Sequence, residues 1–171
     1  AHREICSTRN RSCFHFQSSG LNRPLPSRVE GPHLIRLVPL TAIPTAEVET
    51  LLDAAFGTDR HARTAYRIRE GVTAIDGLSF AAMEEDRLVG TIQAWPVVVI
   101  HDDGADPITL VGPVAVLPEA QQKGIGKALM VRLLDAADAG ASDAMIMIGD
   151  PEYYGRFFGF TADATSGWDV P

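Results

Sequence analysis

The sequence predicts an α+β domain with a central, mixed and twisted sheet that is flanked by helices. Two observations predict this class. Apolar, β-branched stretches separated by turns follow one another over residues 78–116, which is typical of an antiparallel meander. The pattern then changes to a helix that ends at Gly140, a strand over residues 144–149 and a second, short helix. This order favours a mixed sheet with helices packed on it.

A strand and two helices are expected ahead of the meander. The strand covers residues 33–40, and the first helix covers 44–56, where it begins at a proline and ends before Gly57. A weaker helix is expected over residues 62–70. The first helix has an apolar face, which consists of Val48, Leu51, Leu52 and Ala55.

The meander itself is expected to contain three strands. The first covers residues 78–84 and the second covers 88–100, with a charged turn between them. A polar loop over residues 101–106 leads to the third strand, which begins at Ile108 and stays largely apolar as far as Leu117. Because this third strand is short, apolar and β-branched, it is expected to be buried.

The third strand runs into a polar turn that contains Gly124 and Gly126 and opens an amphipathic helix. The first N–H groups of a helix have no partner inside the helix and lie at the positive end of its dipole, so they bind anions. The two glycines leave the backbone open to a ligand, and Lys123 and Lys127 add positive charge. The turn therefore predicts a site for a phosphate or a diphosphate.

Two familiar phosphate motifs do not fit this turn. A dinucleotide fingerprint requires glycine or alanine where the chain has Leu129, and a P-loop requires glycine where the chain has Gln121 and a hydroxyl where it has Ala128. The pattern that fits is Gln-x-x-Gly-x-Gly over residues 121–126. This pattern resembles the acyl-CoA signature of the GNAT superfamily of N-acetyltransferases.

The resemblance extends beyond the loop and covers about residues 33–160. A strand over 114–116 and the pair Pro118-Glu119 precede the loop, as in the family, and a later strand and a short helix that ends in Gly159-Phe160 follow it. The sequence around this short helix is similar to a bacterial subgroup of predicted acetyltransferases. The resemblance implies the GNAT-like acyl-CoA N-acyltransferase fold, in which the fourth and fifth strands splay apart.

The resemblance also implies a function. The chain is expected to be an N-acetyltransferase that uses acetyl-CoA as co-substrate and acetylates a primary amine of a small molecule or a protein by direct attack on the thioester. A non-catalytic module that binds or senses acyl-CoA is the alternative. The residues that would contact the co-substrate are Val114, Ala115, Val116, Gln121, Gln122, Lys123, Gly124, Ile125, Gly126, Lys127 and Ala128.

The family commonly uses a tyrosine on the short helix to protonate the departing thiolate. A phenol stays protonated at neutral pH and can donate to a thiolate. Tyr154 is the preferred candidate and Tyr153 is the alternative. The usual spacing from this tyrosine to the glycine of the Gly-Phe pair falls instead on Gly155, since the doubled phenylalanine at 157–158 adds one residue.

The sequence does not single out a general base. Glu84, Asp150 and Glu152 are possible bases, and so is a chain of water molecules. His61 and His101 are expected in loops or at helix ends, where solvated histidines are common. No metal-binding pattern and no Ser-His-Asp set is present.

Charge and composition limit the partners. The net charge is −7, with +4 on residues 1–36 and −11 on residues 37–171, so nucleic acid is not an expected partner. No apolar run reaches the ~18–20 residues of a membrane span. Both cysteines, Cys6 and Cys13, lie near the beginning of the chain and form no disulfide framework, which favours a reducing, cytoplasmic location.

The two ends of the chain are expected to differ from the family pattern. Residues 1–32 are rich in arginine, serine and proline and are expected to be disordered or to lie outside a domain of residues 33–171. Only eleven residues follow Phe160, so the last strand of the family is expected to be missing. Either the chain is truncated there or a partner completes the open edge, for which a homodimer is one possibility.

Overall fold

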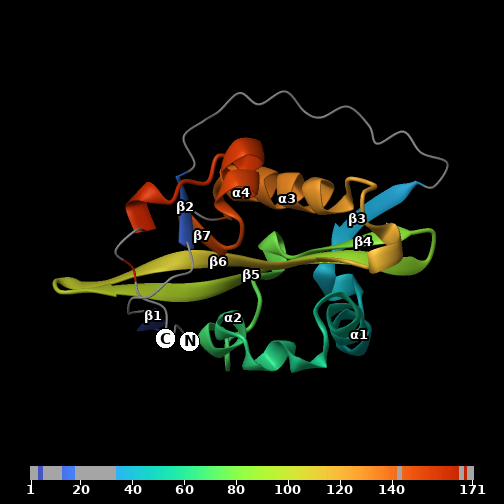
Figure 1. The fold of residues 1–171 in the computed structure, drawn as a ribbon, viewed down its shortest axis with the longest axis horizontal. Coiled ribbons are helices and arrows are strands. Elements are labelled where there is room, and N and C mark those ends of the chain that lie inside the picture. Colours follow the sequence, from blue (N-terminus) through green and yellow to red (C-terminus); the bar gives the residue numbers. More distant parts are fainter. Residues whose placement is uncertain (1–3, 6–12, 18–33, 142–143, 166–167, 169–171) are drawn as a thin grey trace.

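The computed structural model describes residues 4–5, 13–17, 34–141, 144–165 and 168. The α+β class is confirmed, because helices flank a mixed, seven-stranded sheet (Figure 1). The strand order is β2-β7-β6-β5-β4-β3, and β1 pairs with β5 outside this path. The strands are Glu4–Ile5 (β1), Cys13–Gln17 (β2), Ile35–Pro39 (β3), Phe80–Glu84 (β4), Arg87–His101 (β5), Gly104–Val116 (β6) and Ala144–Ile148 (β7).

The α-helices cover both faces of the sheet. Helices α1 and α2 lie on one face, and α3 and α4 lie on the other (Figure 1). Within the described residues, no helix has the length and apolar character of a membrane span. The helix bounds are Thr45–Phe56 (α1), Thr64–Ile68 (α2), Ile125–Ala136 (α3) and Pro151–Phe158 (α4).

The predicted meander is confirmed as β4, β5 and β6, which pair in antiparallel fashion. The strand that precedes it, β3, pairs antiparallel with β4 and lies at one edge of the sheet. Strand β7 pairs in parallel with β6, which makes the sheet mixed. A parallel pair needs a crossover connection, and here α3 provides it.

Helix α3 packs closely on β5, as its predicted apolar face requires. Leu129 and Leu133 are completely buried, and Ile125 is nearly so. At Gly90 of β5, a Cβ atom would lie 3.0 Å from Cγ2 of Ile125 and 3.1 Å from the Ala115 carbonyl oxygen. Glycine at this position therefore allows the first turn of α3 to approach the sheet.

The prediction for residues 1–32 needs a correction at two short segments. Strands β1 and β2 both lie within this stretch and join the sheet. Over Cys13–Gln17, β2 pairs antiparallel with the whole of β7, from Cys13 opposite Ile148 to Gln17 opposite Ala144. An open strand edge offers unpaired N–H and C=O groups, and β2 pairs with this edge of β7. The edge expected to be left open by truncation or completed by a partner is paired here with β2 of the same chain.

Deletion of residues 1–32 is expected to lower the melting temperature by about 2–4 °C or more, the effect of about 1 kcal/mol in a chain of this size. The reason is that the deletion removes β2 and exposes the edge of β7. Scanning calorimetry measures the change. Deletion of residues 1–12 keeps β2 and is the matched control, with a smaller expected loss. Equal melting temperatures for the full chain and the longer deletion would make the whole stretch an extension outside the domain.

Candidate active site

Strands β6 and β7 separate part of the way along β6. Their parallel pairing runs from Thr109 opposite Met145 to Val111 opposite Met147 and then stops, although β6 continues to Val116. The register between β5 and β6 shifts at the same place, because Gly112 and Pro113 together stand opposite Gln93. Such a bulge bends the strand that carries the extra residue. The bulge therefore opens a gap between the two strands.

The bulge residues suit this bend. Gly112 has φ +126°, a conformation that residues with a side chain rarely adopt. Pro113 has no N–H group, so it cannot donate a ladder hydrogen bond. Among the strands that the structure describes, β6 past this point pairs with β5 alone, on one side. The splayed strands that the family resemblance implied are thus a feature of this chain.

Backbone N–H groups of β6 point into the gap. Leu117, directly after β6, donates its N–H to the Val89 carbonyl oxygen at 2.9 Å, so it faces β5. Because N–H groups alternate along a strand, those of Val114 and Val116 face away from β5, whereas that of Ala115 faces it. The Gln121 side-chain amide donates to the Val116 carbonyl oxygen at 3.4 Å, which agrees with this direction. Val114 and Val116 therefore present unpaired donors beside β7.

The glycine loop that follows β6 turns sharply before α3. Gln122 has φ +67° and Gly124 has φ +76°, so two of its residues are left-handed. A Cβ atom on Gly126 would lie 3.7 Å from Cγ2 of Val116 and 3.9 Å from Cγ1 of Val114. The first turn of α3 thus stands directly beside the split part of β6. The loop, the helix start and the gap form one continuous region.

The beginning of α3 has free N–H groups. No side chain caps this helix, and the first helical hydrogen bond runs from the Ala128 N–H to the Gly124 carbonyl oxygen at 2.9 Å. The N–H groups of Ile125, Gly126 and Lys127 therefore have no partner within the helix. Among the predicted contact residues, Ala128 and Gln121 already use their N–H groups, Ala128 toward Gly124 and Gln121 toward the Pro118 carbonyl oxygen. The arrangement fits an anion such as a diphosphate.

The two lysines of the loop behave differently from the prediction of mobile positive charge. Lys123 Nζ forms an ion pair with Glu84 Oε1 at 2.8 Å, which ties the loop to the end of β4. Lys127 Nζ lies 5.3 Å from the centroid of the Phe157 ring, so its side chain leans toward α4. Glu84 was also a candidate base, and this ion pair gives its carboxylate a structural role instead.

Helix α4 is fixed at both ends by its own sequence. The Asp150 carboxylate accepts hydrogen bonds from the N–H groups of Glu152, at 2.9 Å, and Tyr153, at 3.4 Å. Asp150 is therefore an N-cap, which argues against its role as a general base. Gly159 ends the helix with φ +77° and donates to the Gly155 carbonyl oxygen.

The two candidate tyrosines of α4 have different surroundings. The Tyr154 ring lies over Gly149, where any Cβ atom would come within 2.5 Å of the ring. Gly149 directly follows β7, so Tyr154 sits at the end of β7 next to the gap. The Tyr153 side chain is 42% exposed and its ring packs against Tyr154 and Phe157. The structure thus brings Tyr154, rather than Tyr153, to the splayed strands.

The Tyr154 hydroxyl is held in its neutral form. Burial raises the pKa of this phenol above its ordinary value, and the nearby Tyr153 and Asp150 raise it further. Within the described residues, no hydrogen bond engages the hydroxyl. A protonated phenol without a fixed partner at pH 7 can act as a proton donor.

A cavity of about 510 Å³ lies on the other face of the sheet, beside α2. Strand alternation puts Gln93 and Trp95 of β5 on the face opposite to Gly90, which packs on α3. Sequence analysis missed this site, although polar Thr91 and Gln93 alternate with apolar residues in a buried strand and are a readable signal. The lining residues are Glu49, His61, Tyr66, Arg67, Arg69, Glu70, Val72, Gln93 and Trp95.

The remaining candidate bases and histidines fall in separate places. His61 lines the cavity, and its ring packs edge-on against Tyr66 with a centroid distance of 4.9 Å. His101 pairs with Asp106 at 3.1 Å at the tip of the β5–β6 hairpin, away from the cavity lining. Glu152 is exposed in the first turn of α4. In the described residues, no group of three or more potential ligands is placed to hold a metal ion.

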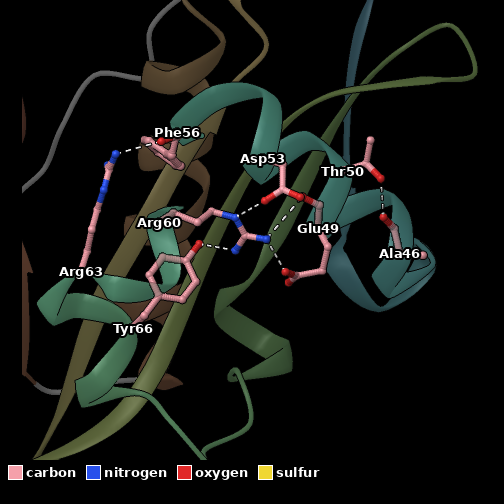
Figure 2. A network of polar contacts seen from close by, with 8 residues as sticks. All are labelled: Ala46, Glu49, Thr50, Asp53, Phe56, Arg60, Arg63 and Tyr66. Carbon is pink, nitrogen blue, oxygen red and sulfur yellow. Dashed lines mark hydrogen bonds and ion pairs between the residues drawn. The ribbon is translucent and has the colours of Figure 1, made fainter. Parts of the chain in front are cut away.

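The wall of the cavity is held by the buried side chain of Arg60. Figure 2 shows its guanidinium group between Glu49 and Asp53 of α1 and Tyr66 of α2. Nε donates to Asp53 Oδ1 at 2.7 Å, and Nη1 donates to the Tyr66 hydroxyl. Burial would lower the pKa of Arg60, but hydrogen bonds to Glu49, Tyr66 and Asp53 outweigh it and raise the pKa. Arg60 thereby joins α1 to α2.

Substitution Arg60→Met is expected to reduce the free energy of unfolding by about 1–3 kcal/mol. The expected loss is smaller than the ~3–5 kcal/mol for breaking a fully buried ion pair. The reason is that both carboxylate partners are more than 40% exposed, so water can solvate them after the change. Urea denaturation measures the loss. Arg63→Met is the matched control, since Arg63 is exposed and, among the described residues, donates to the Phe56 carbonyl oxygen alone (Figure 2). Equal stability of the two variants would show that the Arg60 network does not hold α1 and α2 together.

Comparison with known proteins gives a consistent result. A GNAT family acetyltransferase from Brucella melitensis, solved with acetyl-CoA, is 28% identical with a TM-score of 0.55, and the match covers 81% of this chain and 92% of that one. A GNAT family N-acetyltransferase from Escherichia coli, solved with CoA, is 24% identical with a TM-score of 0.53, over 74% and 67%. The second likeness supports the fold alone. No curated protein matches the chain.

The match to a family model extends over most of the elements described above. The model of the Acetyltransferase (GNAT) family matches residues 45–160, from the first residue of α1 to the end of the α4 turn. This range includes the splayed strands, the glycine loop and Tyr154. Since the family model spans well over half of the sequence, the chain belongs to the GNAT family of acetyltransferases.

Proposed function

We propose that the chain is an acetyl-CoA-dependent N-acetyltransferase that acetylates a primary amine of a small molecule or a protein. One observation carries the proposal. The free N–H groups of the loop, the inward N–H groups of β6 and the protonated Tyr154 all surround the gap between β6 and β7, and the cavity lies on the opposite face. A thioester and an amine can therefore approach one strand from two sides.

The residues fit the parts of acetyl-CoA in a definite order. The N–H groups of Ile125, Gly126 and Lys127 suit its diphosphate, because they are unpaired and lie at a helix N-terminus. Gly124 keeps this surface open, since nothing lies within 4 Å of a Cβ atom there. The N–H groups of Val114 and Val116 suit the acetyl-pantetheine arm. The relative from Brucella melitensis was solved with acetyl-CoA, which supports this choice of co-substrate.

The chemistry assigns a role to each group. The N–H of Val114 or Val116 donates to the thioester carbonyl oxygen and stabilises the negative charge that develops there. The amine nitrogen forms a bond to the carbonyl carbon, the carbon–sulfur bond breaks, and its electron pair stays on sulfur. The proton lost by the amine nitrogen passes along a chain of water molecules to solvent. The Tyr154 hydroxyl protonates the departing sulfur and then regains a proton from solvent.

An amine panel with acetyl-CoA tests the proposal. The full chain is mixed with acetyl-CoA and single amines, and the free thiol of released CoA is followed together with the mass of the acetylated product. Release that depends on an amine and yields an N-acetyl product is the expected result. Tight acetyl-CoA binding without any amine-dependent release would instead favour the alternative, a non-catalytic module that binds or senses acyl-CoA.

A further inference from the structure

The cavity beside α2 has the size and lining of a small-molecule site. Its volume of about 510 Å³ falls within the usual ~300–1,000 Å³ of ligand pockets. Aromatic rings of Tyr66 and Trp95 are combined with side chains of both charges. Such a lining suits a ligand that itself carries both charges. Two of the polar side chains, Arg69 and Gln93, have hydrogen-bonding capacity left over.

Arg69 is a buried cation whose charge is not balanced by an ion pair with a carboxylate among the described residues. It is only 6% exposed, and its Cζ lies 3.6 Å from the Tyr66 ring centroid and 4.9 Å from that of Trp95. Nη1 donates to the Gly112 carbonyl oxygen at 3.3 Å. Across the described ranges, no carboxylate forms an ion pair with Arg69. Burial lowers the pKa of Arg69, although the neighbouring Tyr66 and Glu49 act in the opposite direction.

A guanidinium group that lies over the Tyr66 ring and near the Trp95 ring recognises one kind of partner best. Its planar set of N–H donors matches the two oxygens of a carboxylate. A buried charge is costly unless a counter-charge or several hydrogen bonds accompany it. A carboxylate brought by a ligand would therefore both satisfy Arg69 and be oriented by it.

Gln93 supplies the complementary group. Gln93 is only 7% exposed, and its Oε1 has no hydrogen-bond partner among the described residues. An amide oxygen only accepts hydrogen bonds, so a ligand group that satisfies it must be an N–H or O–H donor. A primary amine is such a donor. Gln93 also stands opposite the bulge of β6, where the strands begin to separate.

Two residues that line the cavity are hydrogen-bonded to the bulge of β6, where the splayed strands separate. The Gly112 carbonyl oxygen accepts from Arg69 and also from Trp95 Nε1, at 2.8 Å. Gly112 belongs to the bulge that opens the gap. An amine held at Gln93 would therefore lie next to the strand whose N–H groups face the gap.

We infer that the acceptor is an amine that also carries a carboxylate, such as a free amino acid, with Arg69 binding the carboxylate and Gln93 Oε1 accepting from the amine. This inference rests on the proposed acetyltransferase function and narrows it to a substrate class. The acidic residues of the lining are already engaged, because Glu49 binds Arg60 and Glu70 has a partner of its own. Arg69 can therefore bind an anion from a ligand, and Gln93 Oε1 can accept one hydrogen bond from a donor on the same ligand.

Amino acids and their α-amides test the inference with the full chain and acetyl-CoA. The amide keeps the size of the acceptor and removes only its negative charge. The wild type is expected to acetylate the acids with a kcat/KM at least about tenfold above that of the amides. In Arg69→Met this preference is expected to vanish, so that the ratio of kcat/KM for acids to kcat/KM for amides falls to about one.

Two further variants separate binding from structure. Arg69→Lys keeps the charge but loses the planar fork, so an intermediate preference for acids is expected. Gln93→Leu removes the acceptor oxygen and is expected to raise KM for acids and amides alike by about tenfold. An Arg69→Met variant that loses activity equally on acids and amides would assign Arg69 a merely structural role and overturn the inference. Melting temperatures identify variants that fail to fold.

Failure of the two proposals gives different results. If amides and simple amines are acetylated as well as the acids, the transferase function stands and the carboxylate preference is wrong. If no amine releases CoA, calorimetry with amino acids decides the matter. Binding of an amino acid that Arg69→Met weakens at least about tenfold would keep the cavity assignment without catalysis. Absence of both release and binding would overturn both proposals.

Discussion

Tyr154→Phe is expected to lower kcat by about 10²–10⁴-fold, the usual span for the loss of a general acid. The substitution keeps the ring over Gly149 and removes only the hydroxyl, so folding is expected to be unaffected. Acetyl-CoA affinity is expected to change little, because the hydroxyl matters most once charge develops on sulfur. Steady-state kinetics with an active amine from the panel measures kcat, and calorimetry measures affinity.

The pH dependence of the reaction provides a second measurement of this role. The donor must be protonated, so kcat is expected to fall as the pH rises through the pKa of Tyr154. Because that pKa is raised, the fall lies above pH ~10, the ordinary value for tyrosine. A fall near or below pH 8 would have to belong to another group. The alkaline limb is expected to be missing in Tyr154→Phe.

Tyr153→Phe is the matched control, since it removes the same hydroxyl one residue away on an exposed side chain. Its kcat is expected to stay within about threefold of wild type. A large loss in Tyr153→Phe with a normal Tyr154→Phe would exchange the two roles. If both variants remain near wild type, neither phenol is the proton donor and water takes over that step.

The sequence was sufficient for those parts of the molecule that are governed by local pattern. Buried Leu129 and Leu133 follow directly from helical spacing, and β4, β5 and β6 follow from apolar stretches separated by turns. The glycine loop was recognised because spacing and flanking elements agree. The N-cap at Asp150 explains why α4 begins where it does, and its position before Pro151 was a readable signal.

Other parts depend on contacts between distant segments, which a single sequence does not reveal. Arg69 lies 43 positions before Gly112, yet the two meet at the bulge. The pairing of β2 with β7 joins segments at opposite ends of the chain. The local sequence around Arg69 does not indicate that this side chain is buried, and only the packing of Tyr66 and Trp95 around it makes the burial visible. The cavity as a whole could not be predicted from the sequence either, because its lining residues come from separate segments of the chain that meet only in the folded structure.

The glycine loop leads to a prediction in which stability and binding change in opposite directions. Gly126 lies in the first turn of α3, where a Cβ atom would make only ordinary contacts with Val114 and Val116. Gly126→Asp places a carboxylate near the positive end of the helix dipole, which favours the fold by about 0.3–1 kcal/mol. A lower entropy of the unfolded chain adds to this. The variant is therefore expected to be folded and at least as stable as the wild type.

The same carboxylate is expected to weaken acetyl-CoA binding at least about tenfold, which corresponds to about 1.4 kcal/mol. The negative charge repels a diphosphate at the N–H groups of Ile125, Gly126 and Lys127. Gly126→Ala is the control, because it adds the Cβ atom without the charge and isolates the steric part of the loss. Calorimetric titration measures affinity and thermal denaturation measures stability. Unchanged affinity in a folded Gly126→Asp variant would remove this loop from the co-substrate site, whereas a rise in stability together with a loss of affinity would locate the anion at the start of α3.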